Sequence, residues 1–153
     1  MLKEILQGIF SRDLNKLKAE IASYKSEDKI WVTEKGITNS AGNLCLHLVG
    51  NLNAFIGAEL GNSGYIRNRP EEFSLKNIPQ DVLIKMVEET IPVVHSSLEH
   101  LTDNDMEKEY PLEVLGEKHS TGFFLVHLAT HLSYHLGQIN YHRRLLEGTL
   151  TTE

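Results

Sequence analysis

Apolar residues recur every three or four positions in four segments of the chain, which is the spacing of one buried face along an α-helix. The segments cover residues 2–26, 40–61, 79–101 and 120–146. Asn39 or Ser40 can cap the second segment, because a short polar side chain accepts a hydrogen bond from the first helical turn. Ser120 or Thr121 can cap the last one in the same way. The pattern therefore predicts four amphipathic helices.

The stretches between these segments lose the helical period. The connection SEDKIWVTEKGITN follows the first helix, and GNSGYIRNRPEEF, rich in Gly, Asn and Pro, is predicted to be a long loop after the second. Part of residues 103–119 is expected to be extended, but no ladder of strands is indicated. We therefore expect an all-α fold, a four-helix bundle, in a single domain that spans residues 1–153.

Charge and cysteine content narrow the class of protein. The formal net charge is -6, and the local pair Arg67 and Arg69, to which we assign no role, is too small to form a basic surface. We therefore expect no nucleic-acid and no membrane partner. Cys45 is the one cysteine, which favours a reducing compartment. With no apolar signal-peptide core and no apolar run near 20 residues, the chain is predicted to be soluble and cytoplasmic.

Histidines are the unusual feature, with eight in the chain and four of them in the last helix. His131 and His135 lie one turn apart, so their imidazoles can converge on one ion at about 2.0–2.1 Å. His142 lies about 10 Å further along the axis, too far to share that ion. His127 also forms an H-x-x-x-H pair with His131, so spacing alone leaves both pairs open.

A metal on two helical histidines needs further ligands. His47 is the best third candidate, because it lies in the middle of the apolar second helix. Cys45 points about 200° away from it around the helix and cannot bind the same ion. Three imidazoles from two helices leave a coordination position open, as in catalytic sites. We leave His95, His100 and His119 without a role.

Several other site chemistries are excluded. The last helix lacks the Glu that follows the first histidine in zinc proteases, so it has no general base of that kind. No Glu-x-x-His occurs, which argues against carboxylate-bridged di-iron bundles. No Walker loop or dinucleotide fingerprint is present.

Two stretches, HLVGNLNAF from His47 and HLSYHLGQINYH from His131, resemble the DinB/YfiT-like superfamily of metal-binding four-helix bundles. The helix order, the length and a long crossover connection fit this resemblance over essentially the whole chain. In that family one histidine of the second helix and two of the last bind the metal. These positions map onto His47, His131 and His135, which favours the later pair over His127. Leu136 stands where many members carry arginine, so no role of that arginine is carried over.

Characterised relatives in that superfamily include bacillithiol S-transferases and a mycothiol-dependent isomerase. The resemblance thus implies a metal-dependent enzyme that activates a low-molecular-weight thiol, or water, for attack on a small molecule, and it also implies a homodimer. A non-catalytic metal-binding or dimeric interaction bundle is the alternative, and haem between two histidines is a third possibility. Imidazole suits Zn, Ni, Cu and Fe alike, and we expect Zn or Ni.

No residue identifies itself as a general acid or base. Asn43, Asn51 and Gln138 each lie three or four positions from a proposed ligand, so we expect them to line the pocket or orient an imidazole. Histidine must be neutral to bind a metal and titrates near about 6.5 when free. The ion should therefore be lost as the pH falls below that region.

Overall fold

Helices form most of the structure. The computed structural model describes residues 1–34 and 36–148, and this part of the chain contains isolated β-bridges but no strand. Its long helices are α1 (Leu2–Ala22), α6 (Gln80–Glu99) and α8 (Thr121–Glu147). A fourth long helical stretch joins α3 (Ala41–Leu52), the π-helix η1 (Asn53–Ala58) and α4 (Glu59–Gly61). The predicted all-α class is confirmed.

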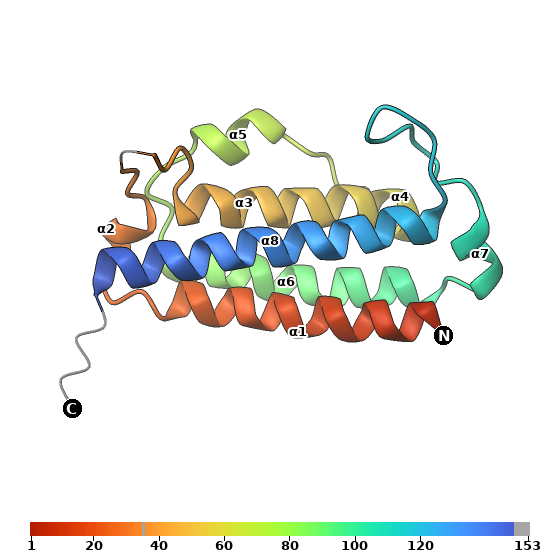
Figure 1. The fold of residues 1–153 in the computed structure, drawn as a ribbon, viewed down its shortest axis with the longest axis horizontal. Helices are drawn as coiled ribbons and strands as arrows, with labels where there is room; N and C mark the ends of the chain where they lie inside the picture. Colours follow the sequence, from red (N-terminus) through yellow and green to blue (C-terminus); the bar gives the residue numbers. More distant parts are fainter. Residues whose placement is uncertain (35, 149–153) are drawn as a thin grey trace.

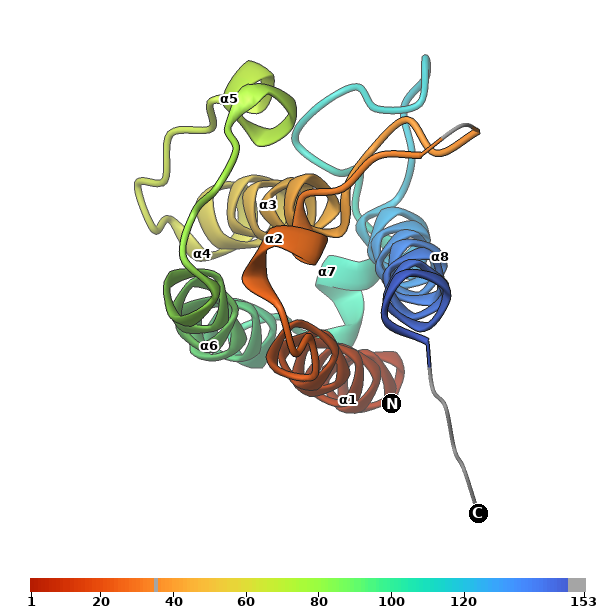
Figure 2. The same cartoon turned by 90° about the vertical axis from the view of Figure 1, so that its left-hand side faces the viewer.

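The four long stretches lie side by side (Figures 1 and 2). Helix α1 packs on α6 and α8, and α3 packs on the same two helices. Helices α1 and α8 run in one direction, and α3 and α6 run in the other (Figure 1). Because α3 and α6 are parallel, residues 62–79 must cross back along the length of the molecule. This crossover carries α5 (Arg69–Ser74), which packs on the outer side of α3.

Serine caps fix where the two site-bearing helices begin. The Ser40 hydroxyl accepts a hydrogen bond from the Asn43 amide at 3.1 Å, and the Ser120 hydroxyl accepts one from the Phe123 amide at 3.2 Å. Ser40 and Ser120 are thus the caps among the predicted alternatives. Leu48 and Leu132, next to two of the candidate ligands, are fully buried, and burial of each stabilises the fold by about 1.5–3 kcal/mol. Both side chains belong to the hydrophobic core on which the two helices pack.

The connections contain short helices that the sequence pattern did not predict. They are α2 (Glu27–Ile30), α5 and α7 (Asp103–Glu107). The prediction of a long loop was therefore wrong for residues 69–73, which lie in α5, where Pro70 stands in the first turn and suits that position. Isolated bridges pair Glu109 with Ser120 and Val114 with Glu117, so part of residues 103–119 is extended as predicted.

The second helical stretch is more apolar than the sequence analysis allowed. Among the described residues, Ala41–Gly61 is the helical stretch that is long and apolar enough to cross a membrane, with a mean hydropathy of 1.2 over its best window. Most of that window, 61%, is buried inside the molecule. The core helix of a soluble protein meets the same criterion, so this stretch is weak evidence for a membrane span.

Candidate metal centre

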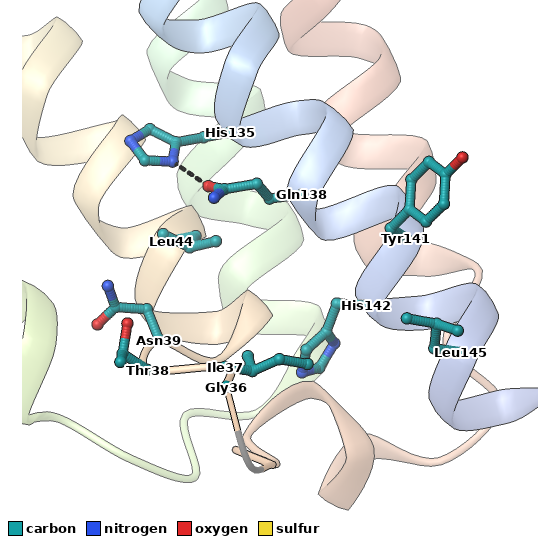
Figure 3. Close-up of a pocket in the computed structure, with 10 residues that line it drawn as sticks. All are labelled: Gly36, Ile37, Thr38, Asn39, Leu44, His135, Gln138, Tyr141, His142 and Leu145. Carbon is teal, nitrogen blue, oxygen red and sulfur yellow. Dashed lines mark hydrogen bonds between the residues drawn. The ribbon is translucent and has the colours of Figure 1, made fainter.

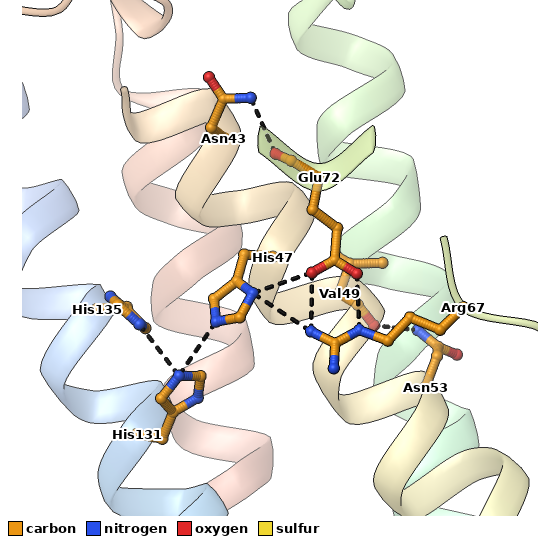
Figure 4. Close-up of polar contacts among 8 residues, drawn as sticks. All are labelled: Asn43, His47, Val49, Asn53, Arg67, Glu72, His131 and His135. Carbon is orange, nitrogen blue, oxygen red and sulfur yellow. Dashed lines mark hydrogen bonds and ion pairs between the residues drawn. The ribbon is translucent and has the colours of Figure 1, made fainter. Parts of the chain in front are cut away.

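Three histidines from α3 and α8 come together in the middle of the molecule. His47 lies halfway along α3, and His131 and His135 lie one turn apart on α8 (Figure 4). The Nε2 atom of His131 is 3.2 Å from that of His47 and 3.1 Å from that of His135. One ligand atom from each lies within 4.8 Å of the other two, so the three histidines could hold a metal ion.

Hydrogen bonds at the far side of two rings set their tautomers. The His47 Nδ1 atom lies 3.0 Å from Glu72 Oε1, and the His135 Nδ1 atom lies 2.7 Å from Gln138 Oε1. Because both oxygens are acceptors, each Nδ1 carries the proton in the neutral ring. The Nε2 atoms of His47 and His135 therefore present lone pairs, and both are directed at His131.

His131 cannot satisfy both of these lone pairs. A neutral His131 has a single N–H, and its Nδ1 atom is buried without a hydrogen-bond partner among the described residues. An N–H at Nε2 of His131 could donate a hydrogen bond to His47 or to His135, but not to both. One cation between the three Nε2 atoms would satisfy all of them. Three nitrogens bound tetrahedrally at about 2.0–2.1 Å lie about 3.4 Å apart, close to the observed spacing.

Burial keeps two of the rings neutral. Desolvation lowers the pKa of His47, although its hydrogen bond with Glu72 acts in the opposite direction. Desolvation, together with the neighbouring His135 and His47, lowers the pKa of His131 to about 4. At neutral pH these two imidazoles are therefore in the form that binds metal.

A buried ion pair from the crossover supports His47 from behind. Arg67 donates from Nε to Glu72 Oε2 and from Nη2 to Glu72 Oε1, both at 2.8 Å. The Glu72 side chain is 7% exposed and that of Arg67 16%. Nη2 also lies 3.4 Å from His47 Nδ1, but the Glu72 contact is shorter. Glu72 thus links a fixed cation to a candidate ligand (Figure 4).

Gly50 makes the close approach of Glu72 to α3 possible. A Cβ atom at this position would lie 2.7 Å from Glu72 Cδ and overlap the carboxylate. The carboxylate is also held by two bonds to Arg67, so it cannot simply swing away. Glycine at position 50 therefore provides the space in which Glu72 reaches His47.

Each of the three amides expected near the ligands has a different environment. Gln138 contacts His135, as predicted for an orienting residue. Asn43 contacts no histidine; it donates to the carbonyls of Glu72 and Leu75, both at 2.9 Å, and so anchors α5. Asn51 is 6% exposed and lines a cavity, and its Oδ1 atom has no partner among the described residues.

The remaining candidates lie outside the cluster. The ring of His127 stacks near that of His131, with centroids 6.3 Å apart, but His127 is not part of the three-histidine group. His142 is buried. Its Nδ1 atom lies 2.6 Å from the Tyr24 hydroxyl oxygen and its Nε2 atom lies 2.8 Å from the Val32 carbonyl oxygen, so its role is structural. Cys45 is buried, and desolvation raises the pKa of its thiol to about 12, so it is not a nucleophile at neutral pH.

Sequence reasoning missed Glu72 and Arg67 as parts of the site. They lie 25 and 20 positions from His47, in a stretch predicted to be a loop. The acidic pair Glu71 and Glu72 after Pro70 is a typical helix start and could have indicated α5. No local pattern could have shown that Glu72 faces His47.

Two cavities adjoin the cluster. One, of about 420 Å³, is lined in part by His47 and His131. The other, of about 330 Å³, is lined by His135, Gln138 and the residues drawn in Figure 3. The candidate metal centre is therefore accessible to small molecules.

Comparisons place the chain among other proteins. Residues 7–150 match the family model "Protein of unknown function (DUF1572)". A solved structure described as the conserved protein of locus from Enterococcus faecalis is similar in fold, with a TM-score of 0.75 and 14% sequence identity, over 95% of this chain and 97% of that one. No curated protein matches the sequence. Because the family model covers nearly all of the chain, the protein belongs to the DUF1572 family.

Proposed function

We propose that His47, His131 and His135 bind one divalent transition-metal ion through their Nε2 atoms. The observation that carries this proposal is the convergence of three Nε2 atoms, two of which present lone pairs fixed by Glu72 and Gln138. Carboxylate or amide partners of this kind behind histidine ligands are a regular feature of metal sites, because they fix the ring and raise its basicity.

The proposed ion is Zn or Ni. Neutral imidazole binds both, and three protein ligands leave a position for water or a substrate. Bound there, the ion would supply Lewis-acid chemistry that lowers the pKa of a thiol or a water molecule. The protein's own contribution is to hold three neutral rings in place, through Glu72 for His47 and Gln138 for His135.

We further propose that the fold is a DinB/YfiT-like four-helix bundle with a long crossover connection. The antiparallel pairing of α1 with α6, the parallel direction of α3 and α6, and the crossover of residues 62–79 support it. Membership of the DUF1572 family is compatible with this assignment. On this basis the protein is a cytoplasmic homodimer whose partners are small molecules.

The activity we propose is metal-dependent attack of a low-molecular-weight thiol, or of water, on a small molecule. The cavity lined by His47 and His131 supports a catalytic role over a purely structural ion, because a closed structural site would have four protein ligands. The test is a screen of thiols against electrophiles with the purified protein. Turnover that His47→Ala abolishes would support the enzyme; metal binding without turnover would favour a non-catalytic bundle.

The metal site itself is tested by elemental mass spectrometry on untagged protein and on the variants His47→Ala and His131→Ala. We expect about one ion per chain in the parent and almost none in either variant. His95→Ala, which changes an exposed histidine of α6, is the matched control and should keep the ion. Equal metal content in all four proteins, or no metal after supplementation with Zn and Ni, would refute the site.

A further inference from the structure

The 420 Å³ cavity has a composition that points to one class of ligand. His47 and His131 are among the residues that line it, and Asn51 and Phe55 come from the second helical stretch. The crossover contributes Arg67 and Arg69 to its wall. Side chains from the connection before α8 and from α8 itself complete the lining, among them Leu115, Phe124 and Leu128. The lining therefore combines apolar side chains, two arginines and two of the three clustered histidines.

Asn51 indicates that this cavity accommodates a polar ligand. The residue is only 6% exposed, and its amide oxygen has no hydrogen-bond partner among the described residues. A buried amide that the protein leaves unpaired costs free energy, and such groups are usually satisfied by water or a bound molecule. Its place in the cavity wall makes a bound molecule the natural partner.

The two arginines are held in place but retain donors. Glu72 accepts hydrogen bonds from Nε and Nη2 of Arg67, so Nη1 remains as a donor for a ligand. The Arg67 guanidinium lies 5.5 Å from the Phe55 ring centroid. The Arg69 guanidinium lies 5.2 Å from the Phe73 ring centroid, and no carboxylate within the described part of the chain forms an ion pair with it. Glu113 is the one acidic side chain in the lining, and it is exposed.

We propose that this cavity binds a small molecule with an apolar body and an acidic group, a carboxylate or a phosphate. The acidic group lies against Arg69 and the remaining donor of Arg67, and the apolar body lies along Phe55, Phe124 and Leu128. The other end of the molecule reaches the histidine cluster, so the ligand is the substrate of the proposed metal site. That last step rests on the proposed function; the recognition of the acidic group does not.

The test uses two probes of equal shape, 3-phenylpropionate and the neutral 3-phenylpropanamide, titrated into the protein as purified and followed by amide chemical shifts. An accessible arginine–carboxylate pair contributes up to about 1 kcal/mol, so we expect the acid to bind about fivefold more tightly than the amide. The preference should shrink in 0.5 M salt, at which charges are screened within a few ångströms.

Arg69→Gln should remove the preference, because Arg69 carries the accessible charge. Arg144→Gln is the matched control, since the Arg144 guanidinium lies 5.3 Å from the Tyr141 ring centroid, outside this cavity, and the preference should persist. Equal affinity for the two probes in the parent protein would overturn the proposal. A preference that persists in Arg69→Gln would show that Arg69 does not recognise the acidic group, and it would overturn the proposal as well. Absence of an ion would contradict the proposed function alone.

Discussion

At the scale of single residues, the arrangement behind His47 is the most informative feature. A carboxylate that accepts the Nδ1 proton leaves Nε2 with a lone pair, and two hydrogen bonds from Arg67 hold the Glu72 carboxylate in place. The Glu72 carboxylate has Arg67 on one side and His47 on the other, and a buried charge is stable only where its partners have such favourable geometry. Glu72 is therefore best explained as a positioning residue for the proposed metal centre.

Glu72→Gln should weaken metal binding by about 10- to 100-fold, the usual cost of losing a partner behind a ligand. The glutamine amide can offer its NH₂ to His47 Nδ1 and so favour the tautomer that blocks Nε2. The measurement is metal affinity by competition with a chelator. Glu71→Gln, an exposed neighbour in α5, should leave the affinity unchanged. Equal affinities in both variants would contradict the role of Glu72.

At the scale of elements, the periodicity of apolar residues was sufficient to predict the four long helical stretches. Short polar side chains limited the caps of two of them to neighbouring pairs, Asn39 or Ser40 and Ser120 or Thr121, of which the structure has Ser40 and Ser120. The periodicity did not predict α5, whose six residues are too few to show a period, nor η1, which has no distinct pattern in sequence. Helix spacing indicated a histidine pair one turn apart on the last helix and a third histidine on an apolar face, but it left His127 and His135 both open as partners of His131. The resemblance to the DinB/YfiT-like superfamily favoured the His131–His135 pair, which is the pair that lies beside His47. The support of His47 by Glu72 could not be predicted, because that contact depends on how the crossover packs.

Gly50→Ala tests the contact between α3 and α5 without removing a polar group. The added methyl should displace the Glu72 carboxylate, so we expect metal affinity to fall by about as much as we expect for Glu72→Gln. Gly8→Ala on α1 has open space around its Cβ and should leave both affinity and fold unaffected. Thermal unfolding of the metal-free variants separates displacement of Glu72 from general loss of structure. Unaltered affinity in a folded Gly50→Ala protein would show that Glu72 does not act through this contact.

At the scale of the whole molecule, the neutral histidines link stability to pH. His131 has a pKa of about 4 in the folded protein and near 6.5 when exposed, so between these values the unfolded chain binds the extra proton. The contribution of His131 to the free energy of unfolding is therefore fully present above about pH 6.5 and is lost as the pH falls toward 4. His47, whose pKa is also lowered, acts in the same direction.

Denaturant unfolding of the metal-free protein at pH 7 and pH 5 should show lower stability at pH 5, and His131→Asn should reduce the difference. With metal present, release should begin below pH 6.5 and extend to lower pH than for free histidine, because burial opposes protonation of His47 and His131. Metal fully retained at pH 4, or stability that rises on acidification, would contradict a buried three-histidine site.

The most direct test of the central claim is an anomalous difference map from crystals of the untagged protein, measured at the absorption edge of the metal found in solution. We predict one peak between the three Nε2 atoms of His47, His131 and His135, at about 2.0–2.1 Å from each. No peak at this position, or a peak bound by other residues, would show that the histidines meet for a reason other than metal binding.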